Sequence, residues 1–368
     1  MKQTVLIVLM TTVLGMLSTA NAAENAGPPE PSGRRLRDIV AEKFPDSRVI
    51  IGGTTGSWSF GTPTGAIMDR EFSYVTPEND FKQAIVHPDP DTWNWALADA
   101  WVRHVAEKGQ VLRIHGPVSP QCSRWAMGDE RTPEELEQLM REFAIALCQR
   151  YNGKPGFISL DVVNEVAVKG KWHTNKPGTR WELPWYMIGQ DTDKNRTPLY
   201  IKMAFEIANQ YAPDLKLIFN HHEDANEEGS WQLIKETIGY LRAAGLRVDG
   251  IGWQAHVDNG WATPSSIKKL KDLIGWAHAN SLEFHVTEAS VWIKGDLTPE
   301  VLELQAQTYG AIVTALLEKR GTGKVGWNTW HIDDPHSWHR QWHGGLFDGT
   351  YAAKPAYYAI QKALEQAK

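Results

Sequence analysis

Eight short apolar runs recur along residues 35–368, each followed by a polar or glycine-containing loop and then by an amphipathic stretch. The runs are four to eight residues long and several are β-branched, which favours buried strands over fragments of helix. Strand–helix alternation over this length predicts a parallel sheet covered by helices, and eight strands favour a closed (β/α)8 barrel of the α/β class. The runs cover 48–53, 72–76, 110–115, 157–163, 215–220, 250–256, 282–287 and 324–330.

Helix-start signals lie between these runs. Thr132-Pro133-Glu134-Glu135 combines an N-cap, a proline at the first helical position and a capping-box acid. Similar starts occur at Thr263 and Thr298. An open, doubly wound sheet is the alternative arrangement, but the first strand-to-loop junction at 52–56 does not fit the Gly-x-Gly-x-x-Gly pattern of dinucleotide-binding folds.

The N-terminus differs from the rest of the chain. Lys2, an apolar run over 5–17 and Ala20-Asn21-Ala22 predict a secretory signal peptide over residues 1–22. Prolines and glycines over 23–34 predict a loose, flexible leader, and 35–368 contains no repeat or linker, so we expect a single catalytic domain. The prediction is a secreted protein, periplasmic or extracellular, with no membrane attachment after cleavage; an uncleaved N-terminal anchor is the alternative.

Composition narrows the choice of partner. The net charge is −6 and no block of Lys or Arg stands out, so we expect no nucleic-acid partner. The 17 Trp residues favour a carbohydrate ligand, because a flat indole stacks well on a sugar ring, although Trp also fills cores. Cys122 and Cys148 are too few for a disulfide framework, and their oxidation state is left open. We expect a monomer.

Polar or aromatic side chains stand at nearly every predicted strand end, which is where the chemistry of such a barrel is found. Each residue alone has an ordinary structural explanation, but their concentration at one rim is unnecessary in a purely structural barrel. They predict a site that contains Glu78, Asn79, Lys82, His115, Asn164, Glu165, Asn220, Gln254, His256, Glu288 and Trp330.

Two of these residues suit glycosidic bond cleavage. That reaction needs one carboxylic acid to protonate the leaving oxygen and one carboxylate to attack the sugar carbon. Glu165 follows the fourth predicted strand and Glu288 follows the seventh, so both face the same mouth of the barrel. We therefore predict Glu165 as general acid/base and Glu288 as nucleophile, with Asn164 placed to bond the sugar 2-hydroxyl.

At these residues the sequence resembles glycoside hydrolase family 10, the retaining endo-β-1,4-xylanases. The resemblance runs from about Val75 to the C-terminus. The acid/base segment is Asp161-Val162-Val163-Asn164-Glu165 and the nucleophile segment is His285-Val286-Thr287-Glu288. The other matching segments, in the family's order, are Glu78-Asn79-x-x-Lys82, His115, Gly250-Ile251-Gly252-x-Gln254-x-His256, Trp330-x-x-x-Asp334-x-x-Ser337-Trp338, and 346–348 with 354–357.

The resemblance implies a role for each site residue and no cofactor. Glu78, Asn79, Lys82 and Trp338 would hold the sugar one unit away from the cleaved bond. The reacting sugar would be surrounded by His115, Asn164, Gln254, His256 and Trp330, and Asn220 would also contact substrate. His256 would in addition orient Glu288.

Departures from the family pattern affect substrate contacts and spare the two glutamates. His221-His222 replaces Asp-Tyr, and 116–119 lacks the usual Trp. Ala289, Trp253 and His331 replace Leu, a small residue and Gly, and the loop over 171–185 contains Trp172, Trp181 and Trp185. The polysaccharide therefore stays open: xylan is expected, and another β-glycan or glycoside is the alternative.

Two further alternatives use the same residues differently. A non-catalytic carbohydrate-binding barrel is one, although the intact pair of glutamates speaks against it. A three-histidine metal site built from His115, His221, His222 and His256 is the other, but no His-x-x-x-His pair or Cys ligand supports it, so no metal is expected.

Overall fold

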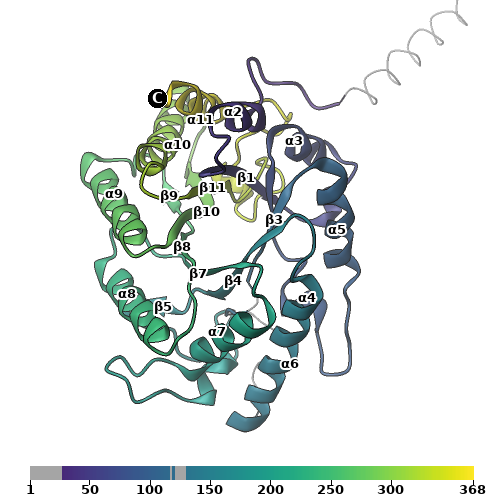
Figure 1. Cartoon of the computed structure of the whole chain (residues 1–368). Helices are drawn as coiled ribbons and strands as arrows, with labels where there is room; N and C mark the ends of the chain where they lie inside the picture. The colour runs from purple at the N-terminus through teal and green to yellow at the C-terminus, as the bar shows by residue number, and fades with distance from the viewer. Residues whose placement is uncertain (1–26, 117, 121–129) are drawn as a thin grey trace, which may run out of the picture.

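The computed structural model describes residues 27–116, 118–120 and 130–368 (Figure 1). Eight parallel strands close into a barrel, because β11 pairs with β1 on one side and with β10 on the other. The predicted (β/α)8 fold is confirmed. The barrel strands are β1 (Val49–Thr55), β2 (Tyr74–Pro77), β3 (Val111–Ile114), β4 (Phe157–Asn164), β7 (Lys216–His221), β8 (Gly250–Trp253), β10 (Glu283–Trp292) and β11 (Val325–Thr329).

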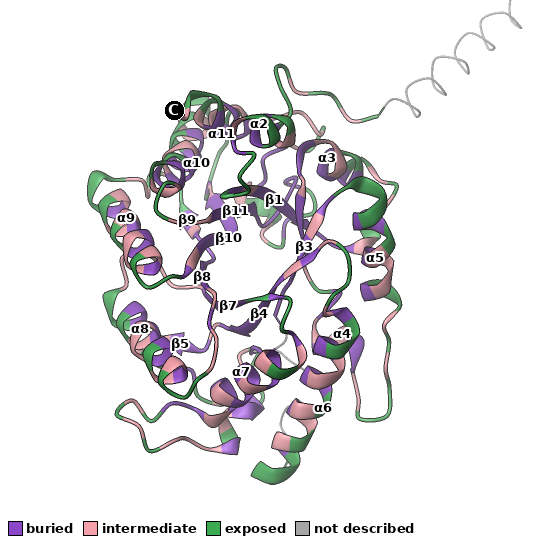
Figure 2. Cartoon of the chain, in the orientation of Figure 1, coloured by how far each residue is buried: buried purple, intermediate pink, exposed green. Residues whose placement is uncertain are grey.

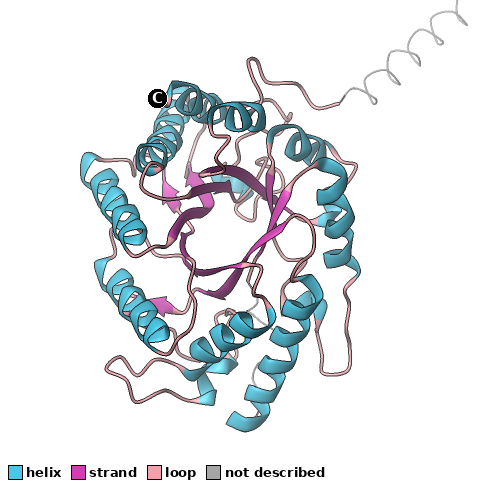
Figure 3. Cartoon of the chain, viewed as in Figure 1, coloured by secondary structure: helices cyan, strands magenta, loops and turns pink. Residues whose placement is uncertain are grey.

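Helices surround the strands on the outside of the barrel (Figure 3). α2 precedes β1 and packs against α11, so the first and last helices of the domain lie side by side. The α-helices are α2 (Leu36–Lys43), α3 (Pro63–Glu71), α4 (Gln83–Val86), α5 (Ala96–Lys108), α6 (Pro133–Tyr151), α7 (Leu199–Tyr211), α8 (Glu228–Ala243), α9 (Pro264–Ala279), α10 (Pro299–Lys319) and α11 (Pro355–Gln366).

The predicted helix starts are confirmed. Thr132 caps α6 in a complete capping box with Glu135, and Thr263 and Thr298 cap α9 and α10 by accepting a hydrogen bond from a backbone N–H. Each cap satisfies a donor that the first helical turn leaves unpaired. The barrel strands are almost wholly buried, and exposed residues gather on the outer faces of the helices and on loops (Figure 2).

Two strands differ from the sequence prediction near the site. The run over 250–256 is broken, because Ala255 has a left-handed φ of 59° between β8 and the short strand β9 (His256–Asp258). The seventh strand, predicted to end at 287, continues as β10 to Trp292, because its second half pairs with β9. Glu288 therefore lies within a strand and not at its end.

The N-terminal predictions are only partly within the described residues. The signal peptide predicted over 1–22 lies outside them. The leader is held on the barrel in its described part, because Gln361 Nε2 donates to the carbonyls of Ser32 and Arg34 at 3.1 and 2.6 Å. The leader over 23–34 stays a prediction. Across the described residues, none of the helices combines the length and the apolar character that a membrane crossing requires.

Candidate active site

A cavity of about 520 Å³ opens at the C-terminal ends of the barrel strands. This is the end at which barrels of this kind place their sites. Its wall contains eleven of the twelve predicted site residues, from six barrel strands and the loops that follow them: Glu78, Asn79, Lys82, His115, Asn164, Glu165, Gln254, His256, Glu288, Trp330 and Trp338. The structure thus brings together residues that are up to 260 positions apart (Glu78 to Trp338).

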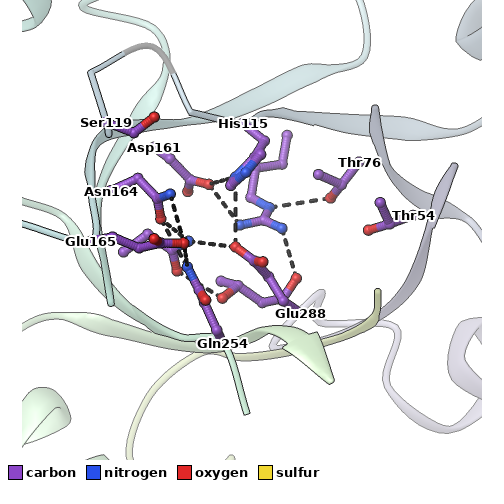
Figure 4. A network of polar contacts seen from close by, with 12 residues as sticks. Thr54, Thr76, His115, Ser119, Asp161, Asn164, Glu165, Gln254 and Glu288 are labelled. Atoms are coloured by element: carbon purple, nitrogen blue, oxygen red, sulfur yellow. Dashed lines mark hydrogen bonds and ion pairs between the residues drawn. The ribbon is translucent and has the colours of Figure 1, made fainter. Parts of the chain in front are cut away.

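Glu165 stands directly after β4 in an uncommon backbone conformation. Its φ of 56° is left-handed, a region that non-glycine residues seldom occupy and that clusters at functional sites. Its Oε1 accepts hydrogen bonds from Gln254 Nε2 at 2.9 Å and from Asn164 Nδ2 at 3.4 Å. The carboxyl group is thereby aimed into the cavity, where Figure 4 shows it beside Gln254.

Glu288 is the more deeply buried of the two glutamates, with 3% of its surface exposed. The pairing of β10 with β11 shifts register between Val286 and Ala289, and this irregularity lies at the position of Glu288. Its Oε1 accepts from Asn220 Nδ2 at 2.8 Å and lies 3.7 Å from His115 Nδ1, and its Oε2 lies 3.4 Å from His256 Nε2. The predicted contact between His256 and Glu288 is present.

Asn220 does not line the cavity, in contrast to the predicted substrate contact. Its side chain is fully buried and already occupied: Nδ2 donates to Asn164 and Glu288, and Oδ1 accepts from Thr287 Oγ1 at 2.7 Å. The space beneath it is tight, because a Cβ on Gly252 would lie 2.3 Å from Asn220 Oδ1. The Asn220 amide therefore connects Asn164, which precedes Glu165, to Glu288. Asn220 is a positioning residue for the two glutamates.

The charge state of Glu288 follows from its surroundings. Burial raises the pKa of this carboxyl, but His115, His256 and Arg113 outweigh burial and lower it to about 2. Opposite charges and hydrogen bonds to a carboxylate favour its ionised form. Glu288 is therefore ionised above about pH 3, as a nucleophile must be.

We expect His256→Ala to move the acidic limb of the kcat/KM profile to higher pH. The substitution removes a positive partner and a hydrogen-bond donor from Glu288, so the pKa of that carboxyl rises toward its ordinary value. The measurement is kcat/KM against pH on a soluble oligosaccharide. His278→Ala is the control, because this ring on α9 bonds Thr322 on the outside of the barrel. An unmoved limb in His256→Ala would contradict the assignment.

A buried ionic layer beneath the glutamates was missed by sequence analysis. Arg113 on β3 donates to Asp161 at 2.8 Å, to the Thr287 carbonyl at 2.7 Å and to Thr76 at 3.2 Å. The same Asp161 oxygen lies 2.8 Å from His115 Nδ1 (Figure 4). Arg113 thus ties β3 to β4, β2 and the segment that presents Glu288, which fixes the floor of the cavity.

Arg113→Met should lower the free energy of unfolding by about 3–5 kcal/mol, since it leaves the Asp161 carboxylate buried without its cation. Urea unfolding followed by fluorescence measures this change. Arg150→Met is the matched control: the Arg150–Asp99 pair is 40% and 41% exposed, so its loss should cost no more than about 1 kcal/mol. Equal losses in the two variants would show that the buried pair does not hold the floor.

Aromatic rings form the upper wall of the cavity. Trp330 meets His115 edge-on at 5.0 Å, and Trp292 stacks on His256 with an interplanar angle of 3°. Trp338 is 43% exposed and lines the cavity, so part of its ring is accessible to a ligand. Its backbone N–H donates to His331 Nε2 at 3.3 Å, and burial and the neighbouring His256 lower the pKa of His331 to about 3, so that ring is a neutral acceptor.

The predicted group Glu78, Asn79 and Lys82 lies together after β2. Lys82 Nζ donates to Asn79 Oδ1 at 2.9 Å. Burial raises the pKa of Glu78, and the charge of Lys82 acts in the opposite direction. The three side chains present hydrogen-bond donors and acceptors on one side of the cavity.

The Trp-rich loop over 171–185 places only one of its three indoles at the site. Trp172 and Trp185 are buried in the core, whereas Trp181 and its neighbour Arg180 line the cavity. The loop begins with the hairpin β5 (Ala167–Val168) and β6 (Lys171–Trp172) and ends in the 3-10 turn η3 (Pro184–Ile188). Arg180, Trp292 and His222 also line the cavity and were not predicted to do so.

The structure also bears on the alternative histidine metal site and on the two cysteines. His221 and His222 lie 5.0 Å apart by ring centroid, but no three His, Cys, Asp or Glu side chains converge as a metal would require in the part of the chain that the structure describes. Cys148 is buried on α6, and burial raises the pKa of its thiol to about 12. Cys122 lies outside the described residues, so the pairing of the two cysteines stays open.

Comparison with known proteins places this site in a family. The profile of glycosyl hydrolase family 10 matches residues 36–363, from α2 to α11. The chain belongs to glycosyl hydrolase family 10. This membership confirms the resemblance found in the sequence.

Individual relatives within family 10 are moderately similar. The endo-1,4-beta-xylanase A of Caldicellulosiruptor saccharolyticus is 33% identical over 319 residues, which cover 80% of this chain and 87% of that protein. The structure of native xylanase 10B from Thermotoga maritima is 28% identical with a TM-score of 0.78, covering 90% and 98%. Xylanase 10B from Thermotoga petrophila RKU-1, in complex with xylobiose, is 25% identical with a TM-score of 0.78, covering 92% and 99%.

Proposed function

We propose that this family 10 protein hydrolyses internal β-1,4 bonds of xylan-type hemicellulose with retention of configuration. The observation that supports this most is the convergence of Glu165 and Glu288 on one cavity, joined by the amides of Gln254, Asn164 and Asn220. The xylanases to which the chain is similar point to xylan as the polysaccharide. No cofactor enters the proposal.

In the proposed reaction, Glu288 attacks the anomeric carbon while Glu165 donates a proton to the leaving oxygen. A covalent glycosyl–enzyme forms on Glu288 and the leaving saccharide departs. Glu165, now a carboxylate, takes a proton from water, and the water oxygen attacks the same carbon and releases Glu288. The low pKa of Glu288 suits both attack and departure.

We assign the surrounding residues to substrate binding. Glu78, Asn79, Lys82 and Trp338 would hold the sugar next to the reacting one, and His115, Asn164, Gln254, His256 and Trp330 would contact the reacting sugar. Asn164 would use the second N–H of Nδ2, since the first donates to Glu165 at 3.4 Å and Oδ1 already accepts from Asn220 and Gln254 at 2.8 and 3.0 Å.

We also propose that the chain is exported and acts as a monomer outside the cytoplasm, after removal of residues 1–22. The basic Lys2, the apolar run and Ala20-Asn21-Ala22 support this proposal. The mass of the protein recovered from the culture medium or periplasm tests cleavage, and a protein that keeps Met1 in the membrane fraction would contradict it.

The function is tested by release of reducing sugar from a panel of β-linked polysaccharides. Xylan should give the strongest signal, and proton NMR of the first products should show the anomer that the substrate had. A stronger signal on glucan or galactan would favour the alternative specificity, and sugar binding without turnover on any member would favour a binding protein.

Trp338→Ala should raise KM for xylooligosaccharides about tenfold and lower kcat less, because the exposed indole offers a stacking face away from the cleaved bond. Initial-rate kinetics measure both constants. Trp58→Ala is the control: this indole is 50% exposed and does not line the cavity. An unchanged KM in Trp338→Ala would remove Trp338 from the binding surface.

A further inference from the structure

Arg180 is an exposed cation on the wall of the cavity with no role in the proposed reaction. Its guanidinium carbon lies 4.8 Å from the centroid of the Trp181 ring. Among the described residues, no carboxylate forms an ion pair with Arg180. The five N–H donors of its guanidinium group are therefore available to a ligand.

The loop that presents Arg180 is held in place by its own hydrogen bonds. The Trp181 carbonyl accepts from His173 Nε2 at 2.8 Å, and the Trp181 N–H donates to Thr179 Oγ1 at 3.2 Å. Further along, the Leu183 N–H donates to Asn175 Oδ1 at 3.1 Å, and Leu183 is fully buried. A preorganised loop loses less conformational freedom when a ligand binds, so the backbone that presents Arg180 is suited to recognition.

Trp292 adds a further aromatic ring to the wall of the cavity. Burial, followed by the charge of Arg180, lowers the pKa of His339, so this neighbouring ring adds no positive charge beside Arg180. Lys294 Nζ lies over the rings of Trp292 and Trp342 at 5.5 and 5.0 Å, and its charge is paired with Asp258 at 2.7 Å. The rim thus combines the guanidinium of Arg180 with the aromatic faces of Trp181 and Trp292, whereas the glutamates lie on the floor beneath.

This combination specifies the chemistry of a ligand. A guanidinium fork matches a carboxylate in bidentate geometry, and an indole face matches the ring of a sugar. The chain as a whole has a charge of −6, so an acidic polymer is not attracted by overall charge and would need a local cation.

We propose that Arg180 binds the carboxylate of a uronic acid side group on the polysaccharide, so that the enzyme prefers acidic xylan to neutral xylan. The inference rests on the proposed function and adds the substrate class. Arg180 would act as a specificity residue, with the Trp181 ring against the sugar that bears the carboxylate.

The test compares two substrates that differ in one group. One is a xylooligosaccharide with a single glucuronic acid side group, and the other is the same molecule with that carboxyl reduced to the alcohol. The ratio of kcat/KM for the acidic over the neutral substrate is measured for each protein at low and high salt. Wild type should favour the acidic substrate, and salt should reduce the ratio.

Arg180→Gln should lower this ratio about tenfold, the size expected for a hydrogen-bonded ionic contact. Arg180→Lys should keep part of it, because Lys retains the charge and loses the fork. Lys176→Gln is the matched control, an exposed cation of the same loop that does not line the cavity. Its ratio should equal that of wild type. Thermal unfolding verifies that every variant is folded.

The outcomes separate the two proposals. Equal ratios in wild type and Arg180→Gln would overturn the role of Arg180 while xylan hydrolysis stands. An equal fall in Lys176→Gln would assign the preference to general charge and would also overturn it. A wild-type protein that cleaves neither substrate would overturn the proposed function, and this inference with it.

Discussion

Glu288→Gln is expected to lower kcat by about 10⁵-fold, the scale on which hydrolases lose activity without their nucleophile. The amide cannot attack the anomeric carbon at a useful rate, so the covalent intermediate does not form. Gln keeps the size of Glu and can still bond Asn220 and His256, so the barrel should remain folded. The measurement is xylooligosaccharide hydrolysis under substrate saturation.

A glutamate of the same strand provides the control for this loss. Glu283 begins β10 at the far end of the barrel, where it contacts His285 and Lys324 outside the cavity. Glu283→Gln should keep kcat within about threefold, because the side chain lies away from the chemistry and Gln keeps its size. If Glu288→Gln also kept kcat within about threefold of wild type, Glu288 would not be the nucleophile. The proposed double displacement through Glu288 would then be wrong.

Glu165→Gln should show a loss that depends on the leaving group. On xylooligosaccharides, whose leaving oxygen needs a proton, kcat should fall by about 10²–10⁴-fold. On an aryl xyloside with an acidic phenol, the bond breaks without that proton, so the first step stays fast. The second step still needs a base, and the glycosyl–enzyme should accumulate.

Two measurements detect the accumulation of the glycosyl–enzyme in Glu165→Gln. Rapid mixing should show a burst of phenol close to one equivalent per enzyme, and mass spectrometry should show the added sugar on the peptide that contains Glu288. Wild type provides the comparison, with no accumulation expected. An equal loss of activity on both substrates, without a burst, would exclude Glu165 as the acid/base.

Much of the fold was accessible from the sequence because its determinants are local. Buried strands need short apolar runs, and Thr-Pro starts satisfy the first helical turn wherever they occur. The alternation and the caps at Thr132, Thr263 and Thr298 could therefore be predicted directly. The turn at Ala255 and the extension of β10 could not be predicted in this way. A left-handed residue and a pairing with β9 depend on neighbours far along the chain.

The same division holds for the site. Residue type and position after a strand were sufficient to nominate Glu165, Glu288 and nine residues that line the same cavity, because a parallel barrel brings all its strand ends to one mouth. Only the tertiary structure decided which side chains face a ligand and which face each other. It directed the amide of Asn220 to its neighbours, buried Arg113 against Asp161, and turned Arg180 and Trp181 to the cavity while Trp172 and Trp185 packed inside. Side-chain direction depends on how strands and loops pack together, and no single segment contains that information.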